Sequence, residues 1–194
     1  SEEYLDHIRG GRAHGWVREM NSKEKYIENS SDIDERFLFV SHGYNLRPTE
    51  IQGAFGLHQI NRLEEFINTR RGNARRISDE LAEFDDLFHL LTERDYTRCT
   101  WFAYPLFVRE SAPFTRDELQ DYLEERQIET RPVLAGNLAR QPALEKIDYK
   151  QVGTLETADS IHQNGLLFGN HHEITEEKSD YVVSTIRQFV NEKI

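Results

Sequence analysis

Residues 42–63, HGYNLRPTEIQGAFGLHQINRL, change within a few positions from a polar turn to an apolar repeat. The first part places an aromatic ring, an amide and a guanidinium, in Tyr44, Asn45 and Arg47, among turn-forming residues. From Pro48 onward, apolar residues recur every three or four positions, which is the period of a helix with one buried face. Pro48 suits the first helical turn, where its missing N–H costs nothing. The stretch therefore predicts a polar loop mounted on a core helix.

In the rest of the sequence, capping residues, glycines and prolines separate apolar segments. They predict alternating helices and strands, and hence an α/β or α+β fold with a small sheet. The apolar spacing after Pro48 continues to about residue 84, as one long helix or as two helices bent near residues 61–64. Thr115 and Glu118 form a capping box, and Thr175 is a second N-cap. Pro105 argues for an edge strand or a bulge. Residues 1–44 are expected to form a short helix and then a loop, with a short strand or buried run at 37–44. Further helices are expected at residues 116–126, 154–164 and 175–190, and strands at residues 101–109, 128–133 and 165–169.

The composition excludes several classes of function. The 194 residues carry 24 Lys and Arg against 35 Asp and Glu, a formal charge of -11, so a nucleic-acid partner is not expected. No apolar run approaches the roughly 20 residues that span a bilayer, so no membrane partner is expected. A single cysteine, Cys99, forms no internal disulfide and fits a cytoplasmic location. The adjacent His171 and His172 would point to opposite faces of a strand, so no metal site is predicted.

Two groups of polar residues in loops are the candidate sites. One is Tyr44, Asn45 and Arg47; the other is Arg131, Asn137 and Arg140. Guanidinium and amide groups on loops held by rigid elements suit phosphates and sugar hydroxyls. The same groups also cap helices and bind loop carbonyls, and these residues alone leave both interpretations open.

The longer stretch at residues 42–71, HGYNLRPTEIQGAFGLHQINRLEEFINTRR, resembles the G-Y-N-x-R-x-T-E/D-x-Q-A-A-x-G-x-x-Q-L-x-x-L segment of the DegT-type sugar aminotransferases. These are pyridoxal phosphate (PLP) enzymes that act on nucleotide-linked keto sugars. RAHGW at 12–16, WFAYPLFV at 101–108 and IETRPVLAGNLARQPAL at 128–144 extend the resemblance over nearly the whole chain. The sequence of residues 130–142, TRPVLAGNLARQP, most resembles the branch of the family that includes the 3-dehydratases of 4-keto-6-deoxy sugars.

The family's segment with the Schiff-base lysine, or the histidine of the dehydratase branch, has no counterpart in these residues. The resemblance therefore implies the C-terminal portion of a fold-type I PLP-dependent transferase. Residues 1–44 would be the tail of the large PLP-binding domain. Residues 45–194 would be the small domain, with a long helix and a small antiparallel sheet with flanking helices. No catalytic residue is assigned in this piece, which is expected to be inactive alone.

The resemblance implies an aminotransferase first, which transfers an amino group from glutamate to a nucleotide-linked keto sugar through PLP and PMP, in surface polysaccharide or lipopolysaccharide biosynthesis. The alternatives are a PMP-dependent 3-dehydratase and a non-enzymatic module that binds a sugar nucleotide or a partner chain. Asn45 would hold the PLP phosphate in the partner subunit of a homodimer, with Tyr44 and Arg47 near the substrate. Arg131, Asn137 and Arg140 would bind the substrate diphosphate.

Overall fold

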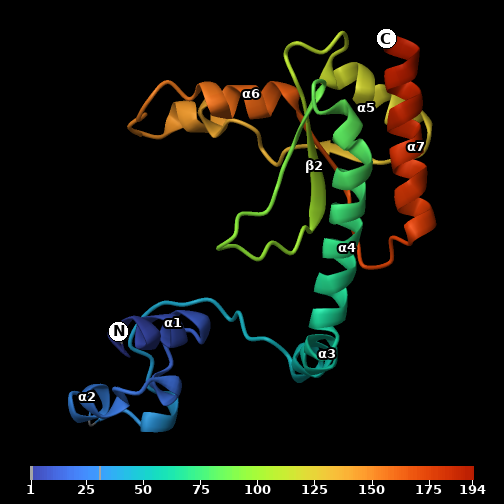
Figure 1. Ribbon diagram of the computed structural model, residues 1–194. Coiled ribbons are helices and arrows are strands. Elements are labelled where there is room, and N and C mark those ends of the chain that lie inside the picture. The colour runs from blue at the N-terminus through green and yellow to red at the C-terminus, as the bar shows by residue number, and fades with distance from the viewer. Residues whose placement is uncertain (1, 31) are drawn as a thin grey trace. The chain divides into compact units, whose positions relative to one another are not determined.

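The computed structural model describes residues 2–30 and 32–194 (Figure 1). The chain divides into two compact units, Ser1–Asn61 and Arg62–Ile194, hereafter unit 1 and unit 2. This division follows contacts within the chain. The predicted boundary at residues 44/45 concerns domains of the longer protein and stays a prediction.

Unit 1 contains short helices and a very small core. Its helices are α1 (Glu2–Arg12), η1 (Val17–Glu19), α2 (Lys23–Glu28), η2 (Glu35–Phe37) and α3 (Glu50–Ile60). Val17, Met20 and Leu38 form its buried cluster. Of the two alternatives for residues 37–44, the strand is wrong: η2 ends at Phe37, and Phe39 makes only an isolated antiparallel bridge with Trp16, although Leu38 is buried. The residues that follow, 41–47, form the loop described below instead of extending a strand.

Helix α3 starts later than predicted and lacks the predicted buried face. Thr49, and not Pro48, begins it: Thr49 and Gln52 form a reciprocal capping box, which leaves Pro48 before the helix. Every residue of α3 is exposed, because its apolar side chains find no packing partner among the described residues. A break follows, and α4 (Leu63–Leu81) begins as a separate helix, so the two-helix alternative is confirmed.

Unit 2 is built on a four-stranded antiparallel sheet in the order β1-β2-β4-β3. The strands are β1 (Phe88–Leu90), β2 (Ala103–Val108), β3 (Thr130–Pro132) and β4 (Gly165–Gly169). Three match predicted strands; β1 was not predicted. The inference that Pro105 marks an edge strand or bulge is wrong, since β2 is central. Pro105 is tolerated because β1 pairs only as far as Leu106, so at Pro105 the strand has a neighbour on one side, β4.

Helices cover the sheet where the sequence predicted them. They are α5 (Arg116–Glu125), α6 (Glu156–Asn164) and α7 (Glu176–Lys193), with short turns η3 (Ala82–Phe84), η4 (Leu138–Arg140) and η5 (Pro142–Lys146). Both predicted N-caps are confirmed: Thr115 forms the capping box with Glu118, and Thr175 accepts from the Lys178 N–H. Helices α4 and α7 run parallel to each other (Figure 1), joined by ion pairs of Arg76 with Asp180 and of Arg187 with Glu80.

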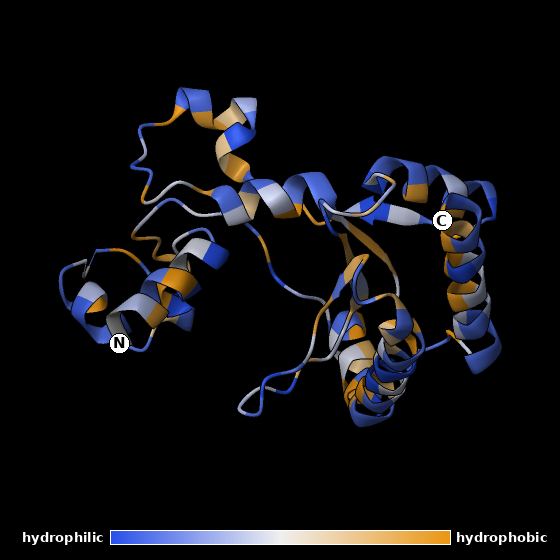
Figure 2. Ribbon diagram, turned by 45° about the horizontal axis from the view of Figure 1, so that its top comes forward, coloured by the Kyte–Doolittle hydropathy of each residue, from blue (hydrophilic) through white to orange (hydrophobic). Residues whose placement is uncertain are grey.

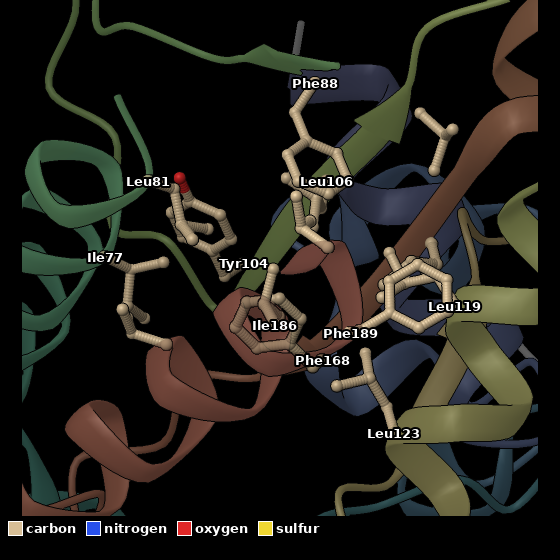
Figure 3. Packing of buried hydrophobic residues seen from close by; sticks show 14 of the residues in the cluster. Ile77, Leu81, Phe88, Tyr104, Leu106, Leu119, Leu123, Phe168, Ile186 and Phe189 are labelled. Atoms are coloured by element: carbon tan, nitrogen blue, oxygen red, sulfur yellow. The ribbon is translucent and has the colours of Figure 1, made fainter. Parts of the chain in front are cut away.

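One face of this sheet carries the hydrophobic core of unit 2. Tyr104, Leu106 and Val108 alternate along β2 toward the helices, while the residues between them lie on the other, partly exposed face. Figure 3 shows Tyr104 and Phe168 among side chains from α4 and α7. In Figure 2, α7, below the C mark, carries hydrophobic and hydrophilic residues in alternation, as expected of a helix with one buried face. Unit 2 therefore closes its own core.

Candidate functional site

The loop at residues 41–47 is fastened by its backbone to the C-terminal end of α1. The Tyr44 N–H donates to the Gly11 carbonyl at 2.6 Å, and the Leu46 N–H donates to the Arg12 carbonyl at 3.1 Å. The last carbonyls of a helix have no partner within the helix, so they are free to accept these bonds. The loop therefore has a fixed backbone although its side chains are exposed.

Two glycines allow this close approach. A Cβ atom on Gly43 would lie 2.6 Å from the Gly11 carbonyl oxygen, and one on Gly15 would lie 1.9 Å from the Ser41 carbonyl oxygen. Gly15 also has φ 82°, which other residues rarely adopt. Glycine at these two positions is thus required for the loop to lie against α1.

Asn45 sits at the centre of a γ-turn, in which the Leu46 N–H donates to the Tyr44 carbonyl at 2.8 Å. Its side chain is exposed, as are Tyr44, at 74%, and Leu46, at 72%. Within residues 2–30 and 32–194, the Asn45 amide makes no hydrogen bond. An amide presented from a fixed turn and not used internally is free to donate to an external acceptor.

Arg47, in contrast, is used within unit 1. Its guanidinium lies 3.2 Å from Glu19 and 5.5 Å from the centroid of the Trp16 ring. Glu19 also binds Arg12, and that hydrogen bond is the main cause that lowers the pKa of the Glu19 carboxyl. Arg47 therefore helps to fix the loop in which Tyr44 and Asn45 project outward. Glu19, which the sequence reasoning missed, is the residue that makes this possible.

The second predicted group divides in unit 2, because Asn137 and Arg140 share one internal partner. Asp159 accepts a hydrogen bond from Asn137 at 2.8 Å and two from Arg140, at 2.9 and 2.7 Å. The Arg140 bonds first, and then the Asn137 bond, lower the pKa of the Asp159 carboxyl to about 2. Asn137 is buried and also caps Ala139. The structure thus gives Asn137 and Arg140 the capping and pairing role that the sequence left open.

Arg131 lies apart from that cluster, on β3 at the rim of a hollow. The hollow, about 620 Å³ in volume, opens over the ends of β2, β3 and β4, and Phe102, Glu129 and Leu134 also line it. Arg131 pairs with Glu129, its Nε donating to Oε1 at 3.0 Å. Sequence reasoning missed Glu129, although residues two apart on a strand point to the same face and would have paired it with Arg131.

The histidine pair stacks with a neighbouring ring, and the single cysteine is exposed. His171 and His172 stack on each other with ring centroids 4.0 Å apart, and His172 stacks on Phe66 at 3.9 Å. Cys99 is free and exposed. The described part of the chain contains no cluster of three potential metal-ligating side chains, and none of its helices is long and apolar enough to cross a membrane.

The arrangement now has a family context. The model of the DegT/DnrJ/EryC1/StrS aminotransferase family matches residues 1–187. The chain belongs to this family. The family expected from the GYN segment is therefore confirmed.

Two curated relatives bear the same enzyme name. The chain is 39% identical over 164 residues to GDP-4-keto-6-deoxy-D-mannose 3-dehydratase of Yersinia pseudotuberculosis, covering 82% of this chain and 41% of that protein. It is 32% identical over 179 residues to the enzyme of that name from Escherichia coli O55:H7, covering 91% of this chain and 45% of that protein. The chain thus spans less than half the length of these relatives.

A solved structure shows the same fold. A GDP-4-keto-6-deoxymannose 3-dehydratase with a trapped PLP-glutamate geminal diamine superposes with a TM-score of 0.80 at 29% identity, covering 95% of this chain and 48% of that one. The chain has the fold of about half of a fold-type I PLP enzyme, as predicted. PLP, the predicted cofactor, is present in that homologue.

The residues of unit 1 fit a bound phosphate group. The exposed Asn45 amide has no internal partner, and the loop that carries it is braced by Gly43 and Arg47. A neutral amide donor on a rigid turn suits a phosphate oxygen. The loop chemistry is therefore compatible with the predicted phosphate contact of Asn45, and that contact stays a prediction.

Proposed function

We propose that this chain is the C-terminal part of a PLP-dependent 3-dehydratase acting on a GDP-linked 4-keto-6-deoxy sugar, with glutamate as the amino donor. The supporting observation is the 39% and 32% identity to two enzymes of that name over most of the chain. The sequence reasoning placed an aminotransferase first and the dehydratase as its alternative. The relatives support the alternative better.

The proposed reaction balances without an external reductant. The sugar loses its C3 hydroxyl and gains a C3–H bond, while glutamate is oxidised to 2-oxoglutarate and ammonia; the sugar oxygen is balanced by the new keto oxygen of 2-oxoglutarate. The cofactor, when bound, supplies the electron sink for these steps. An aminotransferase would instead keep the hydroxyl and place the glutamate nitrogen on the sugar.

The residues of this chain would bind and orient. Asn45 donates to the cofactor phosphate in the partner subunit of a homodimer, and Tyr44 lies beside it toward the substrate. Arg47 holds that loop through Glu19 and Trp16. In unit 2, Arg131 faces the substrate from the rim of its hollow, while Asn137 and Arg140 hold the neighbouring loop through Asp159.

The test uses the full-length protein with GDP-4-keto-6-deoxymannose and glutamate, and follows two products. A 3-dehydratase releases ammonia and a 3-deoxy sugar in equal amounts, with the sugar mass reduced by one oxygen. An aminotransferase gives an amino sugar and 2-oxoglutarate and no ammonia. The second result would overturn the proposal and restore the aminotransferase, which the family as a whole supports. No turnover with any nucleotide-linked keto sugar would favour a binding module.

A further inference from the structure

The loop between β1 and β2, residues 91–102, leads directly into the wall of the hollow. Its last residue, Phe102, is 65% exposed and lines the hollow together with Ala103. The pairing of β1 with β2 ends where Leu90 lies opposite Leu106, so the hydrogen-bond ladder of these two strands stops before the loop. Contacts outside the sheet therefore decide where Phe102 lies.

Trp101, the residue before Phe102, has a strained backbone. Its φ is 49°, in the left-handed region that a bulky side chain rarely adopts. The Trp101 ring packs against the core, where it stacks on Tyr104 with ring centroids 6.2 Å apart. Strain of this kind persists only where the surrounding structure fixes it, and it is concentrated at functional sites. The strained residue thus packs one aromatic ring against the core and leaves the next one exposed at the hollow.

An ion pair holds both sides of this loop to α4. Glu93, near the start of the loop, accepts hydrogen bonds from the two Nη atoms of Arg71, at 2.5 and 2.6 Å. The same carboxylate accepts from the backbone N–H of Cys99, and Arg71 also donates to the Cys99 carbonyl at 2.9 Å. The pair thereby joins the outgoing and the returning side of the loop to one point on α4.

This ion pair is sheltered from water on both sides. Among the ion pairs of the described residues, it is the one in which both side chains are less than a quarter exposed. The hydrogen bonds from Arg71 first, and then the one from the Cys99 N–H, lower the pKa of the Glu93 carboxyl. Removing one partner from a sheltered pair leaves the other charge uncompensated, so the loss of the Glu93 charge should release the loop from α4.

Asn170 holds the other side of the strained residue. Its buried amide donates to the Trp101 carbonyl at 2.8 Å and to the carbonyl of Arg70, on α4, at 3.0 Å. The Trp101 N–H donates to the sulfur of Cys99 at 3.4 Å. Trp101 is therefore bound through both of its backbone groups, on one side by Asn170 and on the other by the residue that the ion pair holds.

We propose that Glu93 is a positioning residue for substrate binding: paired with Arg71, it holds Trp101 in its strained conformation and so fixes Phe102 at the hollow. A wall that is ordered before the nucleotide sugar arrives spares the entropy of ordering it on binding. This inference rests on the proposed function, because it takes the hollow as part of the substrate site. It gives Glu93 an effect on substrate binding and none on the chemical step.

The first experiment follows the surroundings of Trp101 and needs no substrate. The 194-residue chain contains two tryptophans, Trp16 and Trp101, so Trp16→Phe leaves Trp101 as the only emitter. In that background, Glu93→Gln keeps the shape of the side chain and removes its charge. We expect red-shifted emission and stronger quenching by acrylamide, because the ring loses its place on Tyr104. Unchanged emission and quenching would overturn the inference, whatever reaction the full-length protein catalyses.

The matched control for this substitution is Glu64→Gln. Glu64 is also a carboxylate of α4 paired with the same loop, at Arg98, but both side chains of that pair are more than half exposed. An exposed pair contributes little to holding a loop in place. Glu64→Gln should therefore leave the emission and quenching of Trp101 unchanged, and a change as large as that of Glu93→Gln would overturn the assignment to Glu93.

The second experiment measures steady-state kinetics of the full-length holoenzyme with GDP-4-keto-6-deoxymannose, well below the melting temperature of each variant. Glu93→Gln should raise KM for the sugar about tenfold, the worth of one charge-assisted hydrogen bond, and should change kcat by less than about twofold. PLP retention and the kinetics of Glu64→Gln should match wild type. A purely structural role for Glu93 would lower the melting temperature and leave KM unchanged.

The outcomes separate this inference from the proposed function. If Glu93→Gln exposes Trp101 but leaves KM unchanged, or lowers kcat alone, the inference is wrong while the dehydratase proposal stands. If the wild-type holoenzyme transaminates the sugar instead of dehydrating it, the proposed reaction is wrong. A raised KM for that transamination in Glu93→Gln, together with exposure of Trp101, would still support the positioning role.

Discussion

Units 1 and 2 differ in how much of their apolar surface they bury by themselves. Unit 2 packs its helices on one face of the sheet in a single cluster that includes Tyr104, Phe168 and Phe189. Unit 1 has a buried cluster of three residues and leaves α3 exposed, with Ile51 at 73% and Phe55 at 69%. Large exposed apolar areas mark surfaces that bind other chains or segments. The loop with Asn45 thus belongs to the unit with the smaller buried core, and the hollow belongs to the unit with the larger one.

A phenylalanine-to-alanine substitution in each unit tests this difference in burial through the free energy of unfolding. Phe189 is buried and packs edge-on against Phe114 and Tyr122, so Phe189→Ala should cost about 3–5 kcal/mol of unfolding free energy in the 194-residue chain. Phe55→Ala on α3 should change it by less than about 0.5 kcal/mol. Urea unfolding followed by circular dichroism measures both. A Phe55→Ala loss as large as that of Phe189→Ala would mean that α3 is packed in the isolated chain.

A functional substitution sharpens the contrast. In the full-length protein, Asn45→Ala should weaken PLP retention about ten- to a hundredfold, since a donor to a phosphate contributes about 1.5–3 kcal/mol where water is excluded. The apo protein should melt at the same temperature, because the Asn45 side chain is exposed. Cofactor dissociation and apo melting are measured together. Unchanged retention with a lower melting temperature would show that Asn45 is structural.

Mixed dimers test whether Asn45 acts in the partner's site. One subunit carries Asn45→Ala, and the other carries an inactivating substitution at the Schiff-base position of the full-length protein. If Asn45 acts across the interface, both defects fall in one site and the second site is intact, so activity returns. No recovery in dimers of verified composition would contradict that role.

The smallest expected effect is a pH dependence of stability that comes from Asp159 in unit 2. The pKa of Asp159 is lowered from its usual value near 3.8 to about 2, so its contribution to stability is present above about pH 4 and is lost as the pH falls toward 2. The melting temperature of wild type should exceed that of Asp159→Asn at pH 6, and the gap should narrow below pH 4. Differential scanning calorimetry from pH 6 to pH 2 measures it. Glu118 pairs with Lys193 and also has a pKa of about 2. Glu118→Gln is therefore the comparison variant, and its gap to wild type should narrow over the same pH range. A gap that is constant with pH would contradict the Asp159 assignment.

Local signals in the sequence predicted the elements of unit 2. The capping residues Thr115 and Thr175 lie within a few residues of the backbone groups they bind, so spacing alone is sufficient to place α5 and α7. The wrong predictions concern features that depend on contacts between residues far apart in the sequence. The three residues of β1 are a strand only because β2 lies beside them, and Pro105 is accommodated only because β1 ends at Leu90, opposite Leu106. The apolar period of α3 predicted a helix correctly but not what covers it.

The predictions for the site residues also succeeded where the signal was local in the sequence and failed where it depended on distant residues. Residue type and turn chemistry predicted that Tyr44 and Asn45 lie in an exposed loop, and the backbone bond from Tyr44 to α1 agrees with that; their binding roles stay predictions. Asn137 and Arg140 resembled ligand-binding residues because their partner, Asp159, lies 22 and 19 residues away along the chain. No local pattern identifies such a partner.

Asn170 has a consequence for the order in which the chain folds. Its buried amide donates to the carbonyls of Arg70 and Trp101, which lie 100 and 69 residues earlier. At a synthesis rate of roughly 5–20 residues per second, strand β2 exists for several seconds before β4 and Asn170 are made. During that time the edge of β2 that pairs with β4 has no partner strand, and the apolar side chains of β2 lack those of β4. The nascent chain should therefore be most prone to aggregation between the synthesis of β2 and that of β4, and should be a client of chaperones over that interval.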